Sequence, residues 1–207
     1  MSNLFDKVTG TTTSFDSSGV TDSSASFTVD YYTGWYVTID SVEYLITSNT
    51  ATTLVFANSI AANADYSIAI VGRTFLTKIE SDGANTTKIP DALIEKKYDQ
   101  VNTDIQNKIF AYLRGYYTTT FDPLANILNP LVMQQSFAYS VLAKIYQDLM
   151  IDQDSFESFK GYNMYNKDYI EAVKDAISLL QVDFDEDGTA DASEKTQSAA
   201  AYTFLAR

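Results

Sequence analysis

The residue pattern changes near Gly72, and this change constrains the fold more than any other feature of the chain. Before Gly72 the sequence is rich in Thr, Ser, Val, Ile and Tyr. Apolar and polar residues alternate there over residues 35–39, 43–47, 53–56 and 66–71. After residues 81–85 the apolar residues instead recur about every three or four positions. Alternation is typical of half-buried β-strands and the longer period of amphipathic helices, so the pattern predicts an α+β protein with two parts.

The β-rich part is predicted to form a small β-barrel or sandwich over residues 1–80. Polar turn residues at 40–41, 48–50 and 58–64 separate its short strands, which favours a meander that closes on itself. Further strands are expected at 11–15 and 26–29, although the Ser- and Thr-rich stretch 11–26 is also compatible with a loop.

Residues 88–182 are predicted to form an antiparallel α-helical bundle. The first helix carries one apolar stripe, which consists of Leu93 or Ile94, Tyr98, Val101, Ile105, Ile109 and Leu113. Thr103 begins a Thr-x-x-Gln capping box, so a new helix can also start inside this stripe. Asn129 followed by Pro130 predicts the N-cap of a long helix that ends near Met150. A last helix from near Asp154 is expected to lead directly into an acidic loop.

That acidic loop, residues 183–194, fits the calcium-binding loop of an EF-hand at every position that carries a ligand. The predicted metal ligands are Asp183, Asp185, Asp187, the Thr189 carbonyl oxygen, Asp191 and Glu194. Gly188 falls where such a loop turns sharply. The competing interpretation is an acidic, glycine-containing turn that caps the following segment. Because carboxylate and carbonyl oxygens at this spacing suit Ca²⁺, we expect a structural Ca²⁺ site.

The chain contains no second loop of this kind. In addition, Ala190 replaces the larger aliphatic residue through which paired EF-hands contact a sister loop. A solitary loop is suited to fix the angle between the helix before it and the segment after it. A calcium sensor, whose region 169–207 would change its fold at micromolar calcium, is the weakest interpretation.

The composition excludes several classes of function. The chain has no Cys and no His, so it lacks thiolate chemistry and the commonest general base. Its net charge is −13 and its Lys and Arg residues are not clustered, which argues against a nucleic-acid-binding surface. The sequence begins without a secretory signal pattern and contains no long apolar run. We therefore expect a protein that is not an enzyme, is made in the cytoplasm and does not enter a membrane.

Residues 195–207 are predicted to form an extended C-terminal tail that is polar and rich in Ala. Its end is apolar enough to dock onto a partner, through Tyr202, Phe204, Leu205 and Arg207. Packing of this tail on its own domain is the alternative interpretation.

Aromatic residues are frequent in the β-rich part and comprise Tyr31, Tyr32, Trp35, Tyr36, Tyr44 and Tyr66. Exposed aromatic rings stack well on the apolar faces of other molecules, so glycan binding is one interpretation. The stronger interpretation is that these rings pack in the core or form cross-strand pairs.

The helical part also carries features in a recognisable order. Asp104-Ile105-Gln106 lead into residues 111–117, and a loop with Pro123-Leu124 follows. A helical stretch over residues 131–150 comes next, and then a final aromatic helix that includes residues 156–162 and 165–169. Over residues 89–194 this order resembles the head-to-tail adaptor (connector) proteins of tailed bacteriophages. Gly115 splits the Arg-Tyr pair of the family pattern here, and the β-rich part is an addition to the family core.

This resemblance implies a structural virion protein at the neck, or head-to-tail junction. It would form a homo-oligomeric ring, usually of about twelve copies, that joins the portal protein to the next tail or neck protein. DNA would pass through the ring without specific binding, which suits an acidic chain. The C-terminal tail would reach into the portal subunits, and the β-rich part would serve as a decoration or a docking surface. The alternative is a calcium-dependent phage fibre or surface-recognition module, more often trimeric, that binds a host glycan through the N-terminal β domain.

Overall fold

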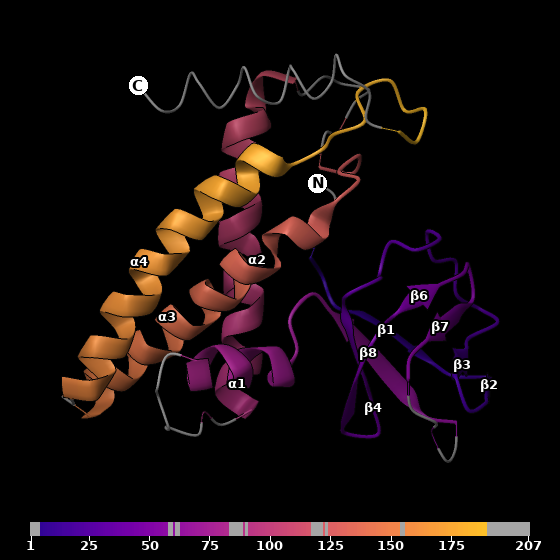
Figure 1. The fold of residues 1–207 in the computed structure, drawn as a ribbon, viewed down its shortest axis with the longest axis horizontal. Helices are drawn as coiled ribbons and strands as arrows, with labels where there is room; N and C mark the ends of the chain where they lie inside the picture. The colour runs from indigo at the N-terminus through magenta and orange to yellow at the C-terminus, as the bar shows by residue number, and fades with distance from the viewer. Residues whose placement is uncertain are drawn as a thin grey trace. The chain divides into compact units, whose positions relative to one another are not determined.

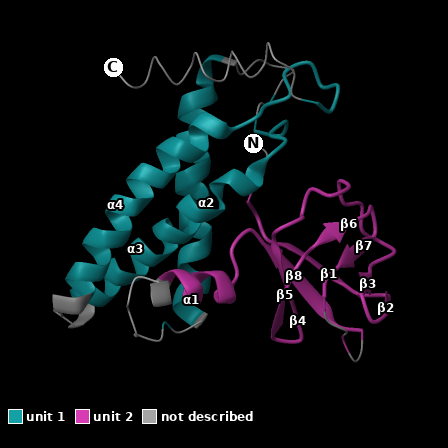
Figure 2. Ribbon diagram, in the orientation of Figure 1, with its two compact units in different colours: residues 1–4, 80–207 teal, residues 5–79 magenta. Residues whose placement is uncertain are grey.

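The computed structural model describes residues 5–57, 60, 63–82, 89, 91–116, 122, 124–153 and 156–189. The chain forms two compact units, and the boundary between them falls between Ile79 and Glu80 (Figure 2). The unit of residues 5–79, called the β unit below, consists of strands and most of one helix, whereas the unit that begins at residue 80, called the helical unit, is built from long helices (Figure 1). The α+β class predicted from the sequence is therefore confirmed.

The β unit contains two four-stranded antiparallel sheets. The first has the order β1-β8-β4-β5 and consists of β1 (Val8–Thr11), β8 (Asp65–Ala69), β4 (Tyr36–Ile39) and β5 (Val42–Leu45). The second has the order β2-β3-β7-β6 and consists of β2 (Ser14–Phe15), β3 (Gly19–Thr21), β7 (Thr53–Val55) and β6 (Ser48–Asn49). The residues that the structure describes do not close into a barrel, so the barrel alternative is wrong.

The alternating pattern of β4 determines which of its side chains are buried. Val37 lies opposite Ile68 of β8 and both are fully buried, whereas Thr38 is exposed. Asp40 and Ser41 connect β4 to β5, with φ angles of 49° and 66°. Two successive residues with positive φ form the type I′ turn, whose twist matches that of the flanking strands.

Some local predictions in this unit are wrong. Residues 26–29 contain no strand, and Phe27 N–H instead donates one hydrogen bond to the Ala51 carbonyl oxygen. Ser48–Asn49 was expected in a turn but forms β6, because β7 offers it backbone partners. The stretch 11–26 is not a simple loop, since it contains β2 and β3. Strands this short depend on their partners more than on their own pattern.

The helix α1 (Arg73–Asp82) begins in the β unit, and a residue far away in the sequence caps its N-terminus. It has no acidic residue in its first turn. Glu43 of β5 supplies the negative charge, because its carboxylate accepts hydrogen bonds from Arg73 N–H at 2.6 Å and Thr74 N–H at 2.7 Å. These bonds satisfy two of the N-terminal donors that a helix leaves free.

The helical unit contains α2 (Asp91–Leu113), α3 (Gln134–Gln153) and α4 (Phe156–Leu179), with two 3₁₀ turns, η1 (Arg114–Tyr116) and η2 (Pro130–Met133). α3 packs against both α2 and α4, and it runs beside α4 in Figure 1. The apolar stripe predicted for α2 is buried at Ile94, Tyr98, Val101, Ile105, Ile109 and Leu113. In α3 the buried residues include Ala138, Val141, Leu142 and Ile145. These helices therefore pack through the faces that their apolar periods define.

α2 continues through Thr103 without a break, so the predicted interruption there is wrong. The Thr103 hydroxyl donates to the Asp99 carbonyl oxygen at 3.0 Å, which satisfies it within the helix and leaves no need for a cap. Among the described residues, no helix is both long enough and apolar enough to cross a bilayer.

Candidate metal centre

The acidic loop begins after a short extended segment, not directly after the last helix as the sequence suggested. α4 ends at Leu179, and Val182 pairs with Ile127 as an antiparallel bridge. Leu128 N–H donates to the Gln181 carbonyl oxygen at 2.9 Å, and Asp183 N–H donates to the Asn126 carbonyl oxygen at 2.9 Å. The segment before the loop is thus held by backbone hydrogen bonds to the segment that precedes η2.

Asn129 strengthens this attachment with its side chain. Its Nδ2 donates to the Leu179 carbonyl oxygen at 2.9 Å, and its Oδ1 accepts from Gln181 N–H at 2.8 Å. The sequence predicted Asn129 as the N-cap of the following helix, but its side chain makes no capping bond there. It instead joins the C-terminus of α4 to the start of η2.

Apolar side chains bury the junction between these two segments. Leu124 and Ile127 from one segment and Leu180 and Val182 from the other are each at most 2% exposed. Burial of these side chains stabilises the position of the backbone at Asp183. The first carboxylate of the acidic loop therefore starts from a fixed point on the helical unit.

Three carboxylates of the loop lie close together. One oxygen from each of Asp183, Asp185 and Asp187 lies within 4.8 Å of the others. Asp183 is buried, whereas Asp185 and Asp187 are exposed. This cluster of oxygen ligands could hold a metal ion, and it matches the first half of the predicted ligand set.

Backbone donors of the loop turn toward these carboxylates. The two oxygens of Asp183 accept from Asp187 N–H at 3.2 Å and from Gly188 N–H at 2.7 Å. Oδ1 of Asp187 accepts from both the N–H and the hydroxyl of Thr189, each at 2.8 Å. The hydrogen bonds orient the carboxylates and curve the loop around them.

Two residues of the loop have left-handed backbone conformations. Gly188 has φ of 87°, and a Cβ at this position would meet nothing within 4 Å. Glycine is therefore required here by the backbone angle and not by a lack of space. Glu186 has φ of 62°, which is uncommon for a residue with a side chain.

The environment of Asp183 favours its charged form. Burial by itself raises the pKa of this carboxyl group, but hydrogen bonds from the backbone N–H groups of Gly188, Asp187 and Glu186 outweigh that effect. The pKa of Asp183 consequently lies below its ordinary value. A deprotonated carboxylate is the form that binds a hard cation.

Only some of the other predicted site residues belong to the part of the chain that the structure describes. The structure includes Thr189, the last described residue of the loop. Asp191 and Glu194 lie outside the described residues, as do the predicted docking residues Tyr202, Phe204, Leu205 and Arg207. The candidate centre is therefore built from Asp183, Asp185 and Asp187.

The aromatic residues considered for glycan binding are largely occupied within the β unit. Trp35 is 1% exposed and Tyr66 is 4% exposed, so their faces are not available to a sugar. The Trp35 ring meets Tyr31 and Tyr32, at centroid distances of 5.9 Å and 5.2 Å, and Tyr44 stacks on Phe56 at 4.6 Å. These contacts match the prediction of core packing.

Sequence reasoning missed the segment that holds the loop. Residues 124–129 were expected only as a connection between helices, yet Asn126, Ile127, Leu128 and Asn129 all contact the segment before Asp183. No sequence signal links these positions, because such a pairing depends on how α3 and α4 bring their ends together.

Comparison with known proteins finds no protein family, curated protein or solved structure that matches this chain.

Proposed function

We propose that this chain is a structural protein of a tailed-phage virion, a head-to-tail adaptor. In this proposal it forms a ring that joins the portal to the next tail or neck protein and lines the channel for DNA. The observation that carries the proposal is the attachment of the acidic loop to the helical unit, through Asp183 N–H and the Asn126 carbonyl oxygen. It fixes the start of the loop to the segment that precedes η2 in the helical unit, the part of the chain that resembles the adaptor family.

The metal in this proposal is Ca²⁺, in a structural role. Asp183, Asp185 and Asp187 would supply the first carboxylate ligands, and the Thr189 carbonyl oxygen, Asp191 and Glu194 would complete the set. Binding would offset the mutual repulsion of three clustered carboxylates. It would fix the direction in which residues 195–207 leave the helical unit, so that Tyr202, Phe204, Leu205 and Arg207 dock onto a portal subunit.

The charge of the chain supports a role beside DNA. A net charge of −13 on each copy repels the phosphate backbone, and a ring would multiply that charge around its channel. DNA could then slide past without being held. A virion protein with this arrangement would join the portal to the tail through assembly contacts and would bind no substrate.

Electron microscopy of the purified protein, with calcium and with chelator, tests the proposal. Rings of about twelve copies, or rings that form when portal protein is added, would support an adaptor. Loss of those rings in chelator would assign the ion to assembly. Monomers or trimers in both conditions, even with portal protein present, would contradict the proposal and favour a surface-recognition module.

A truncated chain tests the docking role of the tail separately. Removal of residues 202–207 should abolish attachment to portal while leaving the folded units and calcium binding unchanged. Cosedimentation with portal protein measures attachment, and circular dichroism controls for folding. Truncated protein that still cosediments would show that the tail does not dock.

A further inference from the structure

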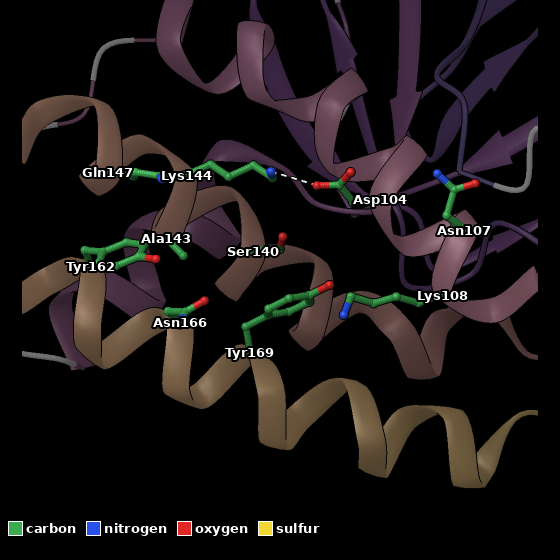
Figure 3. Close-up of a pocket in the computed structure, with 10 residues that line it drawn as sticks. All are labelled: Asp104, Asn107, Lys108, Ser140, Ala143, Lys144, Gln147, Tyr162, Asn166 and Tyr169. Atoms are coloured by element: carbon green, nitrogen blue, oxygen red, sulfur yellow. Dashed lines mark ion pairs between the residues drawn. The ribbon is translucent and has the colours of Figure 1, made fainter. Parts of the chain in front are cut away.

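A pocket of about 240 Å³ lies among α2, α3 and α4, away from the acidic loop (Figure 3). All three helices contribute polar side chains to its walls, among them Asp104, Lys108, Ser140, Lys144, Asn166 and Tyr169. The pocket is open to solvent on one side, because Lys108 and Gln147 of its lining are exposed, whereas Tyr169 is buried. The pocket plays no part in the candidate metal centre or in the proposed docking of the tail.

The charges in the pocket leave one cation without an anionic partner. Lys144 Nζ and Asp104 Oδ2 form an ion pair at 2.7 Å, drawn as a dashed line in Figure 3. Lys108 Nζ lies 5.3 Å from the centre of the Tyr169 ring and makes no ion pair with any described residue. Two lysines against one aspartate give the pocket an excess of one positive charge, in a chain whose net charge is −13.

The Tyr169 hydroxyl is a buried donor that no described group satisfies. The side chain is only 9% exposed, and its hydroxyl oxygen has no hydrogen-bond partner in the described structure. Ser140 is close enough to influence this hydroxyl, but the two groups do not meet the geometry of a hydrogen bond. Burial, together with the nearby charge of Asp104, raises the pKa of Tyr169 to about 12, so the hydroxyl keeps its proton at neutral pH.

In Figure 3 the Lys108 ammonium group is drawn beside the Tyr169 hydroxyl, in agreement with the 5.3 Å between Lys108 Nζ and the centre of the Tyr169 ring. The pair offers a positive charge and a neutral O–H donor, which together suit an acceptor with one negative charge. We propose that this pocket binds a single carboxylate group, held between the Lys108 ammonium group and the Tyr169 hydroxyl.

The same charges discriminate against other ligands. Lys108 and Lys144 would repel a cation. A phosphate dianion carries two negative charges, which the single excess positive charge does not offset, and Asp104 would repel it. A neutral amide has the same shape as a carboxylate but gains no ion pair from Lys108. The carboxylate can belong to a free small molecule or to an Asp or Glu side chain of a second copy of this chain.

Propionate, which has the end group of a Glu side chain, is the probe for the test, and propionamide is its neutral control. Each is titrated into ¹⁵N-labelled full-length protein at constant ionic strength, and the backbone amide signals are followed. We expect saturable shifts with propionate that are centred on Ser140, Ala143 and Asn166. Equal shifts with propionamide, or shifts that map elsewhere, would overturn the proposal.

Variants separate this binding from a general effect of charge. Lys108→Met should abolish the saturable shifts, whereas Lys174→Met, which removes an exposed lysine of α4 outside the pocket, should leave them unchanged. Tyr169→Phe should also weaken propionate binding, without lowering the midpoint of thermal unfolding, because the hydroxyl makes no bond within the described protein. Wild-type binding by the Lys108 variant would refute the site.

Sedimentation velocity then distinguishes the two sources of the carboxylate. If a second copy supplies it, Lys108→Met should lower the sedimentation coefficient of the protein, and Lys174→Met should not. If the ligand is a free small molecule, all three proteins should sediment alike. Both results retain the pocket as a carboxylate site, and neither depends on the ring or on calcium.

Discussion

The backbone N–H of Asp183 donates a 2.9 Å hydrogen bond to the carbonyl oxygen of Asn126. This bond joins the first carboxylate of the acidic loop to the segment that precedes η2 and α3. The position of the loop therefore depends on the packing of α3 against α4 and not only on the sequence of the loop itself. Changes in either segment should affect both the stability of the helical unit and the geometry of the carboxylates.

Replacement of Asn129 by Ala should destabilise the helical unit by about 1–2 kcal/mol, because it removes two hydrogen bonds that join α4 to η2. Urea unfolding measures the change. Asn163→Ala is the matched control, since Asn163 donates only to the Phe159 carbonyl one turn earlier on α4, and its loss should matter by less than about 0.5 kcal/mol. Equal effects of the two substitutions would show that Asn129 is not a junction residue.

Replacement of Asp183 by Asn should weaken calcium binding by at least about tenfold, because it removes the charge of the best anchored ligand. Isothermal titration calorimetry measures the affinity. Asp175→Asn, in an exposed position of α4, controls for the loss of one negative charge and should bind calcium as the wild type does. A titration of Asp183→Asn that matched the wild type would rule out the proposed site.

The β unit should lose stability in acid through Asp22. Hydrogen bonds from Ser24, and then from Tyr66 at 2.8 Å, hold the pKa of Asp22 below its ordinary value of 3.8. A carboxyl group whose pKa is lowered by folding stabilises the protein above its unfolded pKa, and this contribution disappears as the pH falls through the folded pKa. The midpoint temperature of thermal unfolding should therefore fall more steeply for the wild type than for Asp22→Asn as the pH is lowered from about 5 to about 3.

Asp40→Asn is the control for this acid response, because Asp40 lies in the exposed turn between β4 and β5 and Asn also tolerates its positive φ. This variant should keep the wild-type dependence on pH. Parallel curves for the wild type and Asp22→Asn would mean that Asp22 is not responsible for the loss of stability in acid.

Gly72 and Glu43 should be energetically coupled. A Cβ at Gly72 would collide with the Glu43 carboxylate that caps α1, so Gly72→Ala should displace this flexible side chain and cost about as much as loss of the cap, roughly 1–2 kcal/mol. Glu43→Ala alone should cost about 1–2 kcal/mol through loss of the cap. In the double variant Gly72→Ala/Glu43→Ala the collision is absent. The loss of stability of the double variant should therefore be smaller than the sum of the losses of the two single variants. Strict additivity in chemical unfolding would contradict this arrangement.

Several features could be predicted from residues that are neighbours in the sequence. The periods of 35–39 and of 98–113 identified the buried faces of β4 and α2, because a regular backbone repeats its side-chain directions at a fixed interval. The spacing of Asp183, Asp185 and Asp187 likewise indicated that their carboxylates would cluster. In each case the relevant residues lie within one element or one loop.

The sequence by itself thus determined the α+β class, the apolar faces of the helices and the clustering of the acidic loop. Only the tertiary structure decided that Glu43 caps α1, that Asn129 joins α4 to η2, and that Lys108 and Tyr169 share a pocket. These relationships join residues that are far apart in the chain. Their partners are chosen by how whole elements pack, and the local pattern of a sequence does not record that choice.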